Sequence, residues 1–279
     1  MHQPIITIIV AVYNGVTTLQ QCINSIATQT YENKELIVID GMSIDGTVDL
    51  VLLNKDKINY SISEPDKGIY NAWNKALLQA KGEWICFLGA DDYFWDTQVL
   101  EKTACALNQL PAEISIAYSQ VMLLSREGNS LFPVGEPWIK IKDRFKQVMC
   151  IPHQAVMHRR SLFEQHGLFN ESFRIAGDYE LLLRELKKND AIFIDDLILT
   201  GMRQGGISSD PKNTLVAMRE FRLAQQMHSQ RLPGLIWLSA MARLYIRLLL
   251  WGILGEVITR KVLDLYRRIM GLKTYWTKT

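Results

Sequence analysis

The chain has 279 residues, of which 48% are hydrophobic and 22% are charged, with a formal net charge of +2 and a mean hydropathy of +0.00. These values are ordinary for a globular protein, and the length suits one large domain with or without a helical appendage. The four cysteines show no CxxC or metal-finger spacing, which excludes a zinc finger and favours small buried thiols in a reducing compartment.

The N-terminal segment MHQPIITIIVAVYNG lacks the basic region and the small-residue cleavage site of a signal peptide. Its apolar run has the length of a strand and is far too short to cross a membrane. We therefore expect a cytosolic protein.

The first 125 residues alternate short apolar strands with amphipathic helices. The predicted strands are Ile5–Val12, Glu35–Asp40, Asn59–Ser63 and Trp84–Leu88, and the predicted helices are Thr17–Thr28, Thr47–Lys55, Ile69–Ala80 and Thr97–Gln109. Such alternation predicts βαβ units in an α/β fold, with a mostly parallel, Rossmann-like sheet flanked by helices. Ligand sites of these sheets lie beyond the carboxyl ends of the strands.

Polar residues follow each of the four predicted strands at these carboxyl ends. The four segments are Tyr13-Asn14-Gly15, Asp40-Gly41, the run Glu64-Pro65-Asp66-Lys67-Gly68, and Gly89-Ala90-Asp91-Asp92. The sequence therefore predicts a functional edge with three acidic clusters and one polar turn.

The second half of the chain is less regular. We expect residues 125–147 to be loop-rich, followed by a strand at Gln154–His158, a helix at Asp178–Lys188 and a strand at Ala191–Leu199. The pattern is helical from Lys212 onward. We divide the chain into a catalytic domain, residues 1–211, and a basic, apolar helical C-terminal region, residues 212–279.

The C-terminal region is strongly basic. From Lys212 onward there are 12 Lys and Arg against 3 Asp and Glu, a net charge of +9, which leaves 19 basic and 26 acidic residues, a net of −7, in the rest. Arg243 and Arg247 share one face of the apolar stretch Leu232–Gly255. This pattern favours a helix lying on an anionic membrane surface, with packing on the catalytic domain as the alternative.

The acidic strand ends favour binding of a nucleotide and a metal. Mg²⁺ and Mn²⁺ prefer oxygen ligands and often take one or two carboxylates together with substrate phosphates, which makes Asp91-Asp92 a candidate site. Asp40 is a candidate to hold a nucleotide, and Asp91 to accept hydrogen bonds from a ribose. Neither a dinucleotide-binding GxGxxG after the first strand nor a Walker A sequence is present.

Five segments in this order, TIIVAVYNG, VIDGMSIDGT, EPDKGIYNAWNKAL, GEWICFLGADD and AGDYELLLR, resemble the family 2 glycosyltransferases with the GT-A fold. The similarity covers roughly residues 4–210 and points to the bacterial branch that builds capsule, exopolysaccharide and lipopolysaccharide chains. It implies an inverting transfer of sugar from a nucleotide-sugar donor, most often a UDP-sugar, to a glycan or lipid-linked acceptor at the inner face of the cell membrane.

The resemblance also implies residue roles. Asp40 matches the residue that recognises the base, Asp91 the one that contacts ribose, and Asp92 the ligand of a divalent metal, Mn²⁺ or Mg²⁺. Tyr13 and Asn14 match the turn that lines the nucleotide pocket. Lys67 is a candidate for the base or phosphates, and Asn74 is assigned to the same site.

Asp178 matches the catalytic base of the family, at the start of the AGDYELLLR helix. Many relatives carry Glu-Asp at this point, whereas this chain has Gly177-Asp178. Without the resemblance, the simpler interpretation is that Asp178 is an acidic residue in the first turn of a helix, where the helix dipole favours a negative charge. In an inverting reaction, the base removes the proton of the acceptor hydroxyl while the diphosphate leaves from the opposite face.

Other candidates carry open alternatives. His153, Gln154 and Ser208 are candidates to face the donor sugar or the acceptor, and a structural role is the alternative for the histidine. Arg203 and the turn from Gly205 to Ser208 are candidates to hold the diphosphate through a guanidinium and backbone N–H groups, and a structural turn is the alternative.

Two other functions remain to be weighed. A nucleotidyltransferase acting on sugar phosphates would share the metal, the nucleotide and the sheet, but it would carry a glycine- and lysine-rich loop after its first strand. A sugar- or lipid-binding scaffold without activity is the non-enzymatic alternative. We expect no nucleic-acid partner, because leucine and tryptophan alternate with the basic residues of the C-terminal region.

Overall fold

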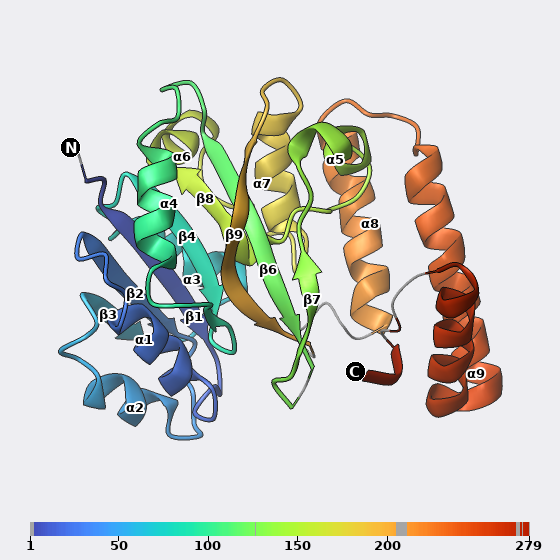
Figure 1. Ribbon diagram of the computed structural model, residues 1–279, viewed down its shortest axis with the longest axis horizontal. Helices are drawn as coiled ribbons and strands as arrows, with labels where there is room; N and C mark the ends of the chain where they lie inside the picture. The colour runs from blue at the N-terminus through green and yellow to red at the C-terminus, as the bar shows by residue number, and fades with distance from the viewer. Residues whose placement is uncertain (1–2, 126, 205–210, 272–273, 275, 279) are drawn as a thin grey trace.

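A nine-stranded sheet forms the centre of the described structure (Figure 1). The computed structural model describes residues 3–125, 127–204, 211–271, 274 and 276–278. The strands are β1 (Ile6–Val12), β2 (Lys34–Asp40), β3 (Tyr60–Ser63), β4 (Trp84–Gly89), β5 (Tyr93–Phe94), β6 (Ile116–Leu124), β7 (Ser130–Val134), β8 (Val156–Arg159) and β9 (Ile192–Arg203).

Helices connect most of these strands. They are α1 (Leu19–Ala27), α2 (Thr47–Leu53), α3 (Ile69–Leu77), α4 (Val99–Leu107), α5 (Trp138–Phe145), α6 (Arg160–His166), α7 (Gly177–Leu186), α8 (Pro211–Met227) and α9 (Leu235–Ile269). Two short 3-10 turns, η1 (His153–Ala155) and η3 (Trp276–Lys278), complete the described elements.

The strand order is β3-β2-β1-β4-β8-β6-β9-β5, with β7 paired to β6. Strands β1 to β4 are parallel, and β8 is antiparallel to both β4 and β6. Strand β6 therefore runs in the direction of β4, as does its parallel partner β9. Because only β5, β7 and β8 are reversed, the predicted mostly parallel sheet is confirmed.

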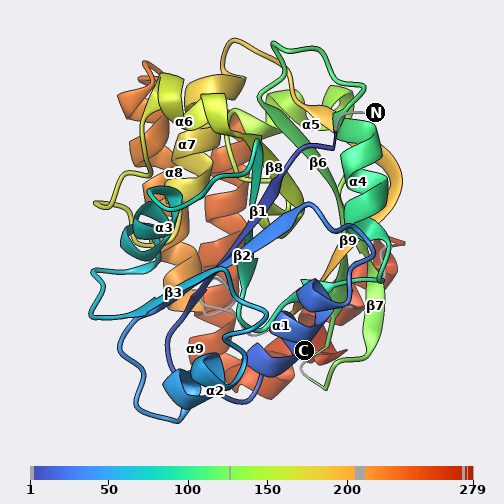
Figure 2. The same ribbon diagram turned by 90° about the vertical axis from the view of Figure 1, so that its left-hand side faces the viewer.

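Alternate residues of β1 enter different cores on the two faces of the sheet. Ile8 and Val10 pack with α1, α2 and α4, whereas Ile9 packs with α3, α5, α6 and α7. Successive side chains of a strand point to opposite faces, so a strand covered on both sides reads as a continuous apolar run. Figure 2 shows the blue and green helices α1, α2 and α4 on one side of β1 and α3, α6 and α7 on the other.

The region expected to be loop-rich is more regular than predicted. Strand β7 and helix α5 both lie within residues 125–147, and β6, which precedes them, was not among the predicted strands. Trp138, Ile141 and Phe145 of α5 enter the core beside α3 and α7. The sequence analysis did not recognise this helix, because lysines stand between its apolar residues. A short helix needs only one apolar face to pack against a core.

Helix α8 packs against α7 in the core. Ala224 is fully buried in the core beside α7, and His228 lies 2.8 Å from Glu180 of α7. The next helix, α9, packs on the far side of α8, where Met218 contacts Met241 and Leu244. Figure 1 shows α7, α8 and α9 side by side toward the end of the molecule opposite α1 and α2.

Gly255 divides α9 into two arms. Its φ of 73° and ψ of 170° are not helical, and only glycine adopts such a conformation readily. None of the described helices is long and apolar enough to cross a membrane.

Candidate active site

The ends of β1, β2 and β3 form the first part of the candidate site around Asp40. The Asp40 side chain is 1% exposed, and its two oxygens accept hydrogen bonds from the Ser43 N–H at 3.0 Å, the Ser43 hydroxyl at 2.5 Å and the Ser63 hydroxyl at 2.5 Å. Asn14 joins this group, because its N–H donates to the Ser43 hydroxyl and its side-chain oxygen accepts the N–H of Ile44. Buried polar groups that are paired in this way hold a fixed geometry.

Tyr13 and Asp66 lie on either side of Gly41. A Cβ atom at position 41 would lie 2.6 Å from Asp66 Oδ2 and 3.4 Å from the Tyr13 ring. Tyr13 is 65% exposed and Lys67 is also exposed, so both side chains are open to a ligand at this edge. The backbone here comes close to the acid because position 41 has no side chain.

Asp91 and Asp92 follow β4 beside this first part. A Cβ atom at Gly15 would lie 3.6 Å from the Cβ atom of Ala90, so the turn after β1 contacts the turn that carries both carboxylates. Asp92 is 4% exposed and accepts the N–H of Arg203 at 3.2 Å, while Asp91 is half-buried.

Burial and the neighbouring charge of Asp91 both raise the pKa of Asp92, and a hydrogen bond from the Gln154 side chain opposes the shift. Among the described residues, no lysine or arginine forms an ion pair with either carboxylate. Two adjacent carboxylates, one of them buried without a counter-charge, fit a divalent cation.

The protein alone would not complete such a site. In the described part of the chain, no group of three or more His, Cys, Asp or Glu side chains converges on one point. Mg²⁺ and Mn²⁺ sites built on one or two carboxylates fill their remaining positions with water and substrate phosphate oxygens. The residues present therefore fit a cation that is shared with a diphosphate.

Asp178 lies in the first turn of α7 and contacts α3. Its Oδ1 atom accepts the N–H of Tyr179 at 2.8 Å and lies 3.3 Å from the Tyr70 hydroxyl, which also lies 2.6 Å from the carbonyl oxygen of Ile175. Burial raises the pKa of Asp178 to about 6, against the opposing effect of these hydrogen bonds. A carboxyl group with such a pKa is suited to exchange protons near neutral pH.

Gly177 allows the Tyr70 ring to reach this position. A Cβ atom at residue 177 would lie 2.8 to 2.9 Å from three carbons of the ring. Any side chain here would displace the tyrosine that contacts Asp178. The close approach of the Tyr70 ring thus explains why residue 177 is a glycine.

A layer of aromatic rings joins Asp178 to the strand-end carboxylates. The Tyr70 and Trp73 rings of α3 lie 5.4 Å apart, and Trp73 stacks on His153 at 5.1 Å. The next residue, Gln154, reaches Asp92. A continuous chain of contacts therefore connects Asp178 to Asp92.

His153 is a neutral member of this layer. Burial lowers its pKa to about 3, and its Nε2 atom is buried without a hydrogen-bond partner. The structural alternative for this histidine is favoured by its stacking, whereas Gln154 lies directly at the carboxylates.

Two other predicted site residues, Asn74 and Arg203, bind neighbouring parts of the chain. The Asn74 amide is bonded to the backbone of Phe169 in both directions and to Glu171, so it holds residues 169–171. The guanidinium of Arg203 donates a hydrogen bond to Gln21, whereas only the backbone N–H of Arg203 donates to Asp92. Ser208 and the turn 205–208 lie outside the described residues.

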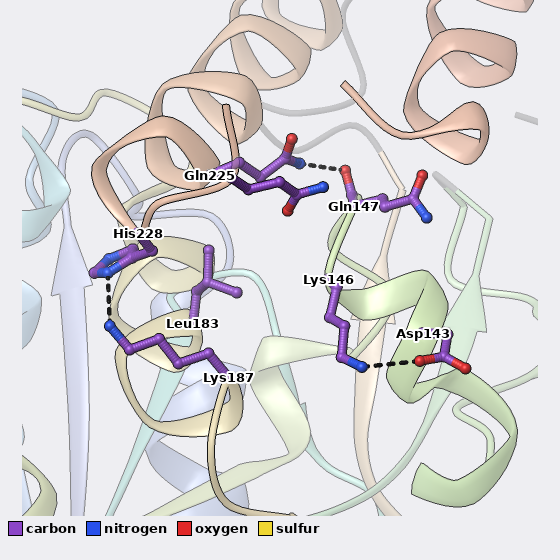
Figure 3. A pocket seen from close by; sticks show the side chains of 8 residues that line it. Asp143, Lys146, Gln147, Leu183, Lys187, Gln225 and His228 are labelled. Carbon is purple, nitrogen blue, oxygen red and sulfur yellow. Dashed lines mark hydrogen bonds and ion pairs between the residues drawn. The ribbon is translucent and has the colours of Figure 1, made fainter. Parts of the chain in front are cut away.

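A cavity of about 420 Å³ lies elsewhere, between α5, α7 and α8 (Figure 3). Its lining includes Lys146, Lys187 and His228, and Gln225 spans its wall by donating to the carbonyl oxygen of Gln147. Lys187 follows Asp178 by nine residues, which is roughly 13 Å along a helix. None of the predicted site residues lines this cavity.

The structure adds four residues that the sequence analysis did not assign to the site. They are Ser43, Ser63, Tyr70 and Glu220. Ser43 lies in the motif VIDGMSIDGT and Ser63 is the last residue of a predicted strand, so a search near the strand ends for side chains able to bond Asp40 would have found them. Glu220 follows Asp178 by 42 residues and gives no local signal.

Comparison with known proteins decides the family. The sequence model described as Glycosyl transferase family 2 matches residues 7–165, more than half of the chain. The chain belongs to this family. The resemblance expected from the five motifs is confirmed, and the match favours a glycosyltransferase over a nucleotidyltransferase.

A curated relative and two solved structures agree with this assignment. The PGL/p-HBAD biosynthesis glycosyltransferase of Mycobacterium bovis is 30% identical over 187 residues, which are 66% of this chain and 70% of that protein. The structure of S. aureus TarS 1–349 with UDP-GlcNAc has a TM-score of 0.62 at 19% identity, over 78% of this chain and 66% of that one. The chain spans 39% of a longer TarS structure.

The second structure covers almost the whole chain. The mannosyltransferase PcManGT from Pyrobaculum calidifontis, in complex with GDP-Man and Mn²⁺, has a TM-score of 0.63 at 16% identity, over 99% of this chain and 83% of that one. Identities this low show the fold alone. The predicted GT-A fold is confirmed.

Proposed function

We propose that this glycosyltransferase is metal-dependent and inverting, and that it transfers a sugar from a UDP-sugar to a hydroxyl group of a glycan or lipid-linked acceptor. One observation carries the proposal. Asp178, whose pKa is raised to about 6, is joined by continuous contacts to the strand-end carboxylates Asp91 and Asp92. A base and a cation-binding acid are the two groups that such a transfer needs.

The nucleotide lies, in this proposal, against the ends of β1, β2 and β3. A carboxylate has about four acceptor positions, and Asp40 uses three of them within the protein, which leaves one for the N–H of a uracil ring. Tyr13 and Asn14 line the pocket, Lys67 faces the base or phosphates, and Asp91 accepts hydrogen bonds from the ribose.

Asp92 would hold the cation, with the remaining ligands supplied by the diphosphate and water. Once bound, such a cation would supply positive charge that stabilises the departing diphosphate. The backbone N–H of Arg203 donates to the Asp92 carboxylate and helps to fix its orientation, with the Gln154 side chain beside it. Arg203 is a further candidate to bind the diphosphate, provided that its guanidinium leaves Gln21. Ser208 remains a candidate to face the donor sugar or the acceptor. Asn74 would act by holding residues 169–171 in place.

Asp178 would act as the general base. The acceptor oxygen forms a bond to the anomeric carbon as the bond from that carbon to the diphosphate breaks, and the acceptor proton passes to an Asp178 oxygen. Because attack and departure occur on opposite faces, the configuration of the sugar inverts. The Tyr70 hydroxyl, 3.3 Å from Asp178 Oδ1, keeps the carboxylate in place during this transfer.

A panel of sugar nucleotides tests the proposal. The purified protein is incubated with UDP-GlcNAc, UDP-glucose, UDP-galactose or GDP-mannose, with Mn²⁺ or with EDTA, and release of the nucleoside diphosphate is measured. We expect hydrolysis of a UDP-sugar that requires Mn²⁺ and gives a sugar of inverted configuration. If no donor is hydrolysed and none raises the melting temperature, the proposal fails and a scaffold without activity is favoured.

We also propose that α9 rests on an anionic membrane surface at the inner face of the cell membrane, where a lipid-linked acceptor lies. Leu235, Leu238, Tyr245 and Leu249 follow helical spacing on the first arm and are all exposed. The second arm adds further exposed apolar side chains, namely Val257, Ile258, Leu265 and Ile269.

Basic residues flank this apolar stripe. Arg243, Lys261 and Arg268 are exposed, and each basic residue near an anionic bilayer contributes about 1 kcal/mol of attraction. An apolar helix face bordered by arginine and lysine is typical of a helix that lies in the plane of a membrane interface. The charge favours an anionic lipid surface as the partner.

Sedimentation with vesicles tests this second proposal. We expect the protein to bind vesicles that contain phosphatidylserine and to bind pure phosphatidylcholine weakly. Leu249→Glu should reduce binding, whereas Leu52→Glu on α2, where the leucine is exposed to the same degree, should not. Equal binding by the two variants would show that α9 does not contact the membrane.

A further inference from the structure

Glu220 of α8 holds the segment that leads into the helix of Asp178. Its Oε1 atom accepts the N–H of Arg174, and its Oε2 atom accepts the N–H groups of Ile175 and Ala176, each at 2.8 Å. All three N–H groups lie before the first turn of α7, where no carbonyl group of that helix can accept them. Ala176, which immediately precedes α7, has no side chain that could cap it. A carboxylate from another helix therefore does the capping.

The same segment is held from the other side by Tyr70. The carbonyl oxygen of Ile175 lies 2.6 Å from the Tyr70 hydroxyl, and this hydroxyl lies 3.3 Å from Asp178 Oδ1. Glu220 thus binds the N–H side of residue 175 while Tyr70 binds its carbonyl side. A shift of this residue would move both the start of α7 and the hydroxyl that contacts Asp178.

Helix α8 is itself fixed against α7. Phe221 and Ala224 enter the core beside Tyr179, and His228 contacts Glu180 at 2.8 Å. Residues 220, 221, 224 and 228 share one face of α8 because they follow helical spacing. Glu220 is therefore presented by a helix whose position is set by packing along its length.

We propose that Glu220 is a positioning residue, which fixes Asp178 in the orientation that proton removal from the acceptor requires. This inference rests on the proposed role of Asp178 as the base. The negative charge of Glu220 also contributes to the raised pKa of Asp178, after the larger effect of burial. Glu220 would then act on the reaction in two ways, by geometry and by charge, without touching substrate.

Glu220→Gln tests the proposal with Arg219→Gln as the matched control. Arg219 is the neighbouring residue on α8 and is exposed. The assay is Mn²⁺-dependent hydrolysis of UDP-GlcNAc, or of whichever donor the panel identifies, well below the melting temperature of each variant. A misplaced catalytic group can cost roughly 100-fold in rate, so we expect kcat of Glu220→Gln to fall by about 10-fold to 100-fold while the donor KM changes less than about twofold.

The pH profile separates positioning from simple capping. Loss of the Glu220 charge should move the acid limb of kcat to lower pH, and Arg219→Gln should leave it in place. If Glu220→Gln lowers only the melting temperature and keeps the kcat and pH profile of the control, Glu220 is a structural cap and the proposal is overturned.

Two further variants complete the test. If Glu220→Gln does not fold, Glu220→Asp keeps the charge but shortens the side chain, so a reduced kcat with an unchanged acid limb is expected, and a wild-type kcat would overturn the proposal. Asp178→Asn is measured in parallel. Its inactivity beside a fully active Glu220→Gln would overturn only the positioning role, whereas turnover by Asp178→Asn would overturn the proposed function itself.

Discussion

Replacing Asp178 with asparagine removes a proton acceptor while keeping the shape of the side chain and the oxygen that accepts the Tyr179 N–H. General base catalysis contributes about 10² to 10⁴ in rate, so kcat should fall by about this factor. Donor affinity should stay near wild type, because Asp178 lies at the start of α7 and not at the strand ends assigned to the nucleotide. In the wild type, the acid limb of kcat should fall near pH 6, where the Asp178 pKa lies.

The same substitution should stabilise the protein at alkaline pH. The pKa of Asp178 rises from 3.8 to about 6 on folding, which corresponds to about 3 kcal/mol of destabilisation once the group is ionised. Below pH 3.8 the carboxyl is protonated in both the folded and unfolded states and the cost is absent. As pH rises through about 6, the carboxyl ionises in the folded state, and the full destabilisation applies. Asparagine does not ionise and so avoids this destabilisation.

Urea unfolding of both proteins at pH 8 and at pH 4 measures this effect. We expect Asp178→Asn to be more stable than wild type by up to about 3 kcal/mol at pH 8, with a smaller difference at pH 4. A difference that is the same at both pH values would refute the burial argument. Retention of wild-type kcat would refute the assignment of the base.

Two further substitutions test other parts of the site. Asp92→Asn should abolish the Mn²⁺-dependent rise in melting temperature on adding UDP, whereas the exposed Asp49→Asn should keep it; loss in both variants would point away from a cation at Asp92. Gly177→Ala should destabilise the protein by about 1 to 3 kcal/mol because its methyl group overlaps an aromatic ring, and should lower kcat. Gly252→Ala has nothing within 4 Å of the added methyl and should be neutral or stabilising, so equal unfolding midpoints for the two alanine variants would contradict the packing argument.

Much of the fold and half of the site follow from local sequence patterns. The strand ends that carry Asp40 and Asp92 could be predicted because each buried strand is a continuous apolar run that stops at a polar turn. Strand β6 was missed, although it lies in the middle of the sheet, because it is not followed by a helix and so lacks the alternation that identified the others.

Contacts between distant segments account for the rest. Glu220 and Tyr70 reach the Asp178 segment from helices whose relative placement depends on core packing, and no spacing in the sequence reports it. Asn74 was assigned to the nucleotide because it lies in a matched motif, and in the structure both of its side-chain N–H groups donate to Phe169 and Glu171. A motif identifies residues that belong together and leaves open which of them meet the ligand.

The aromatic layer under the site has a mechanical consequence. Trp73 contacts both Tyr70 and His153, so one rigid indole links the tyrosine beside Asp178 to the residue that precedes Gln154. Rings that are packed edge and face cannot shorten or lengthen as flexible chains do. A smaller residue at position 73 would therefore disturb the surroundings of Asp178 and of Gln154 together.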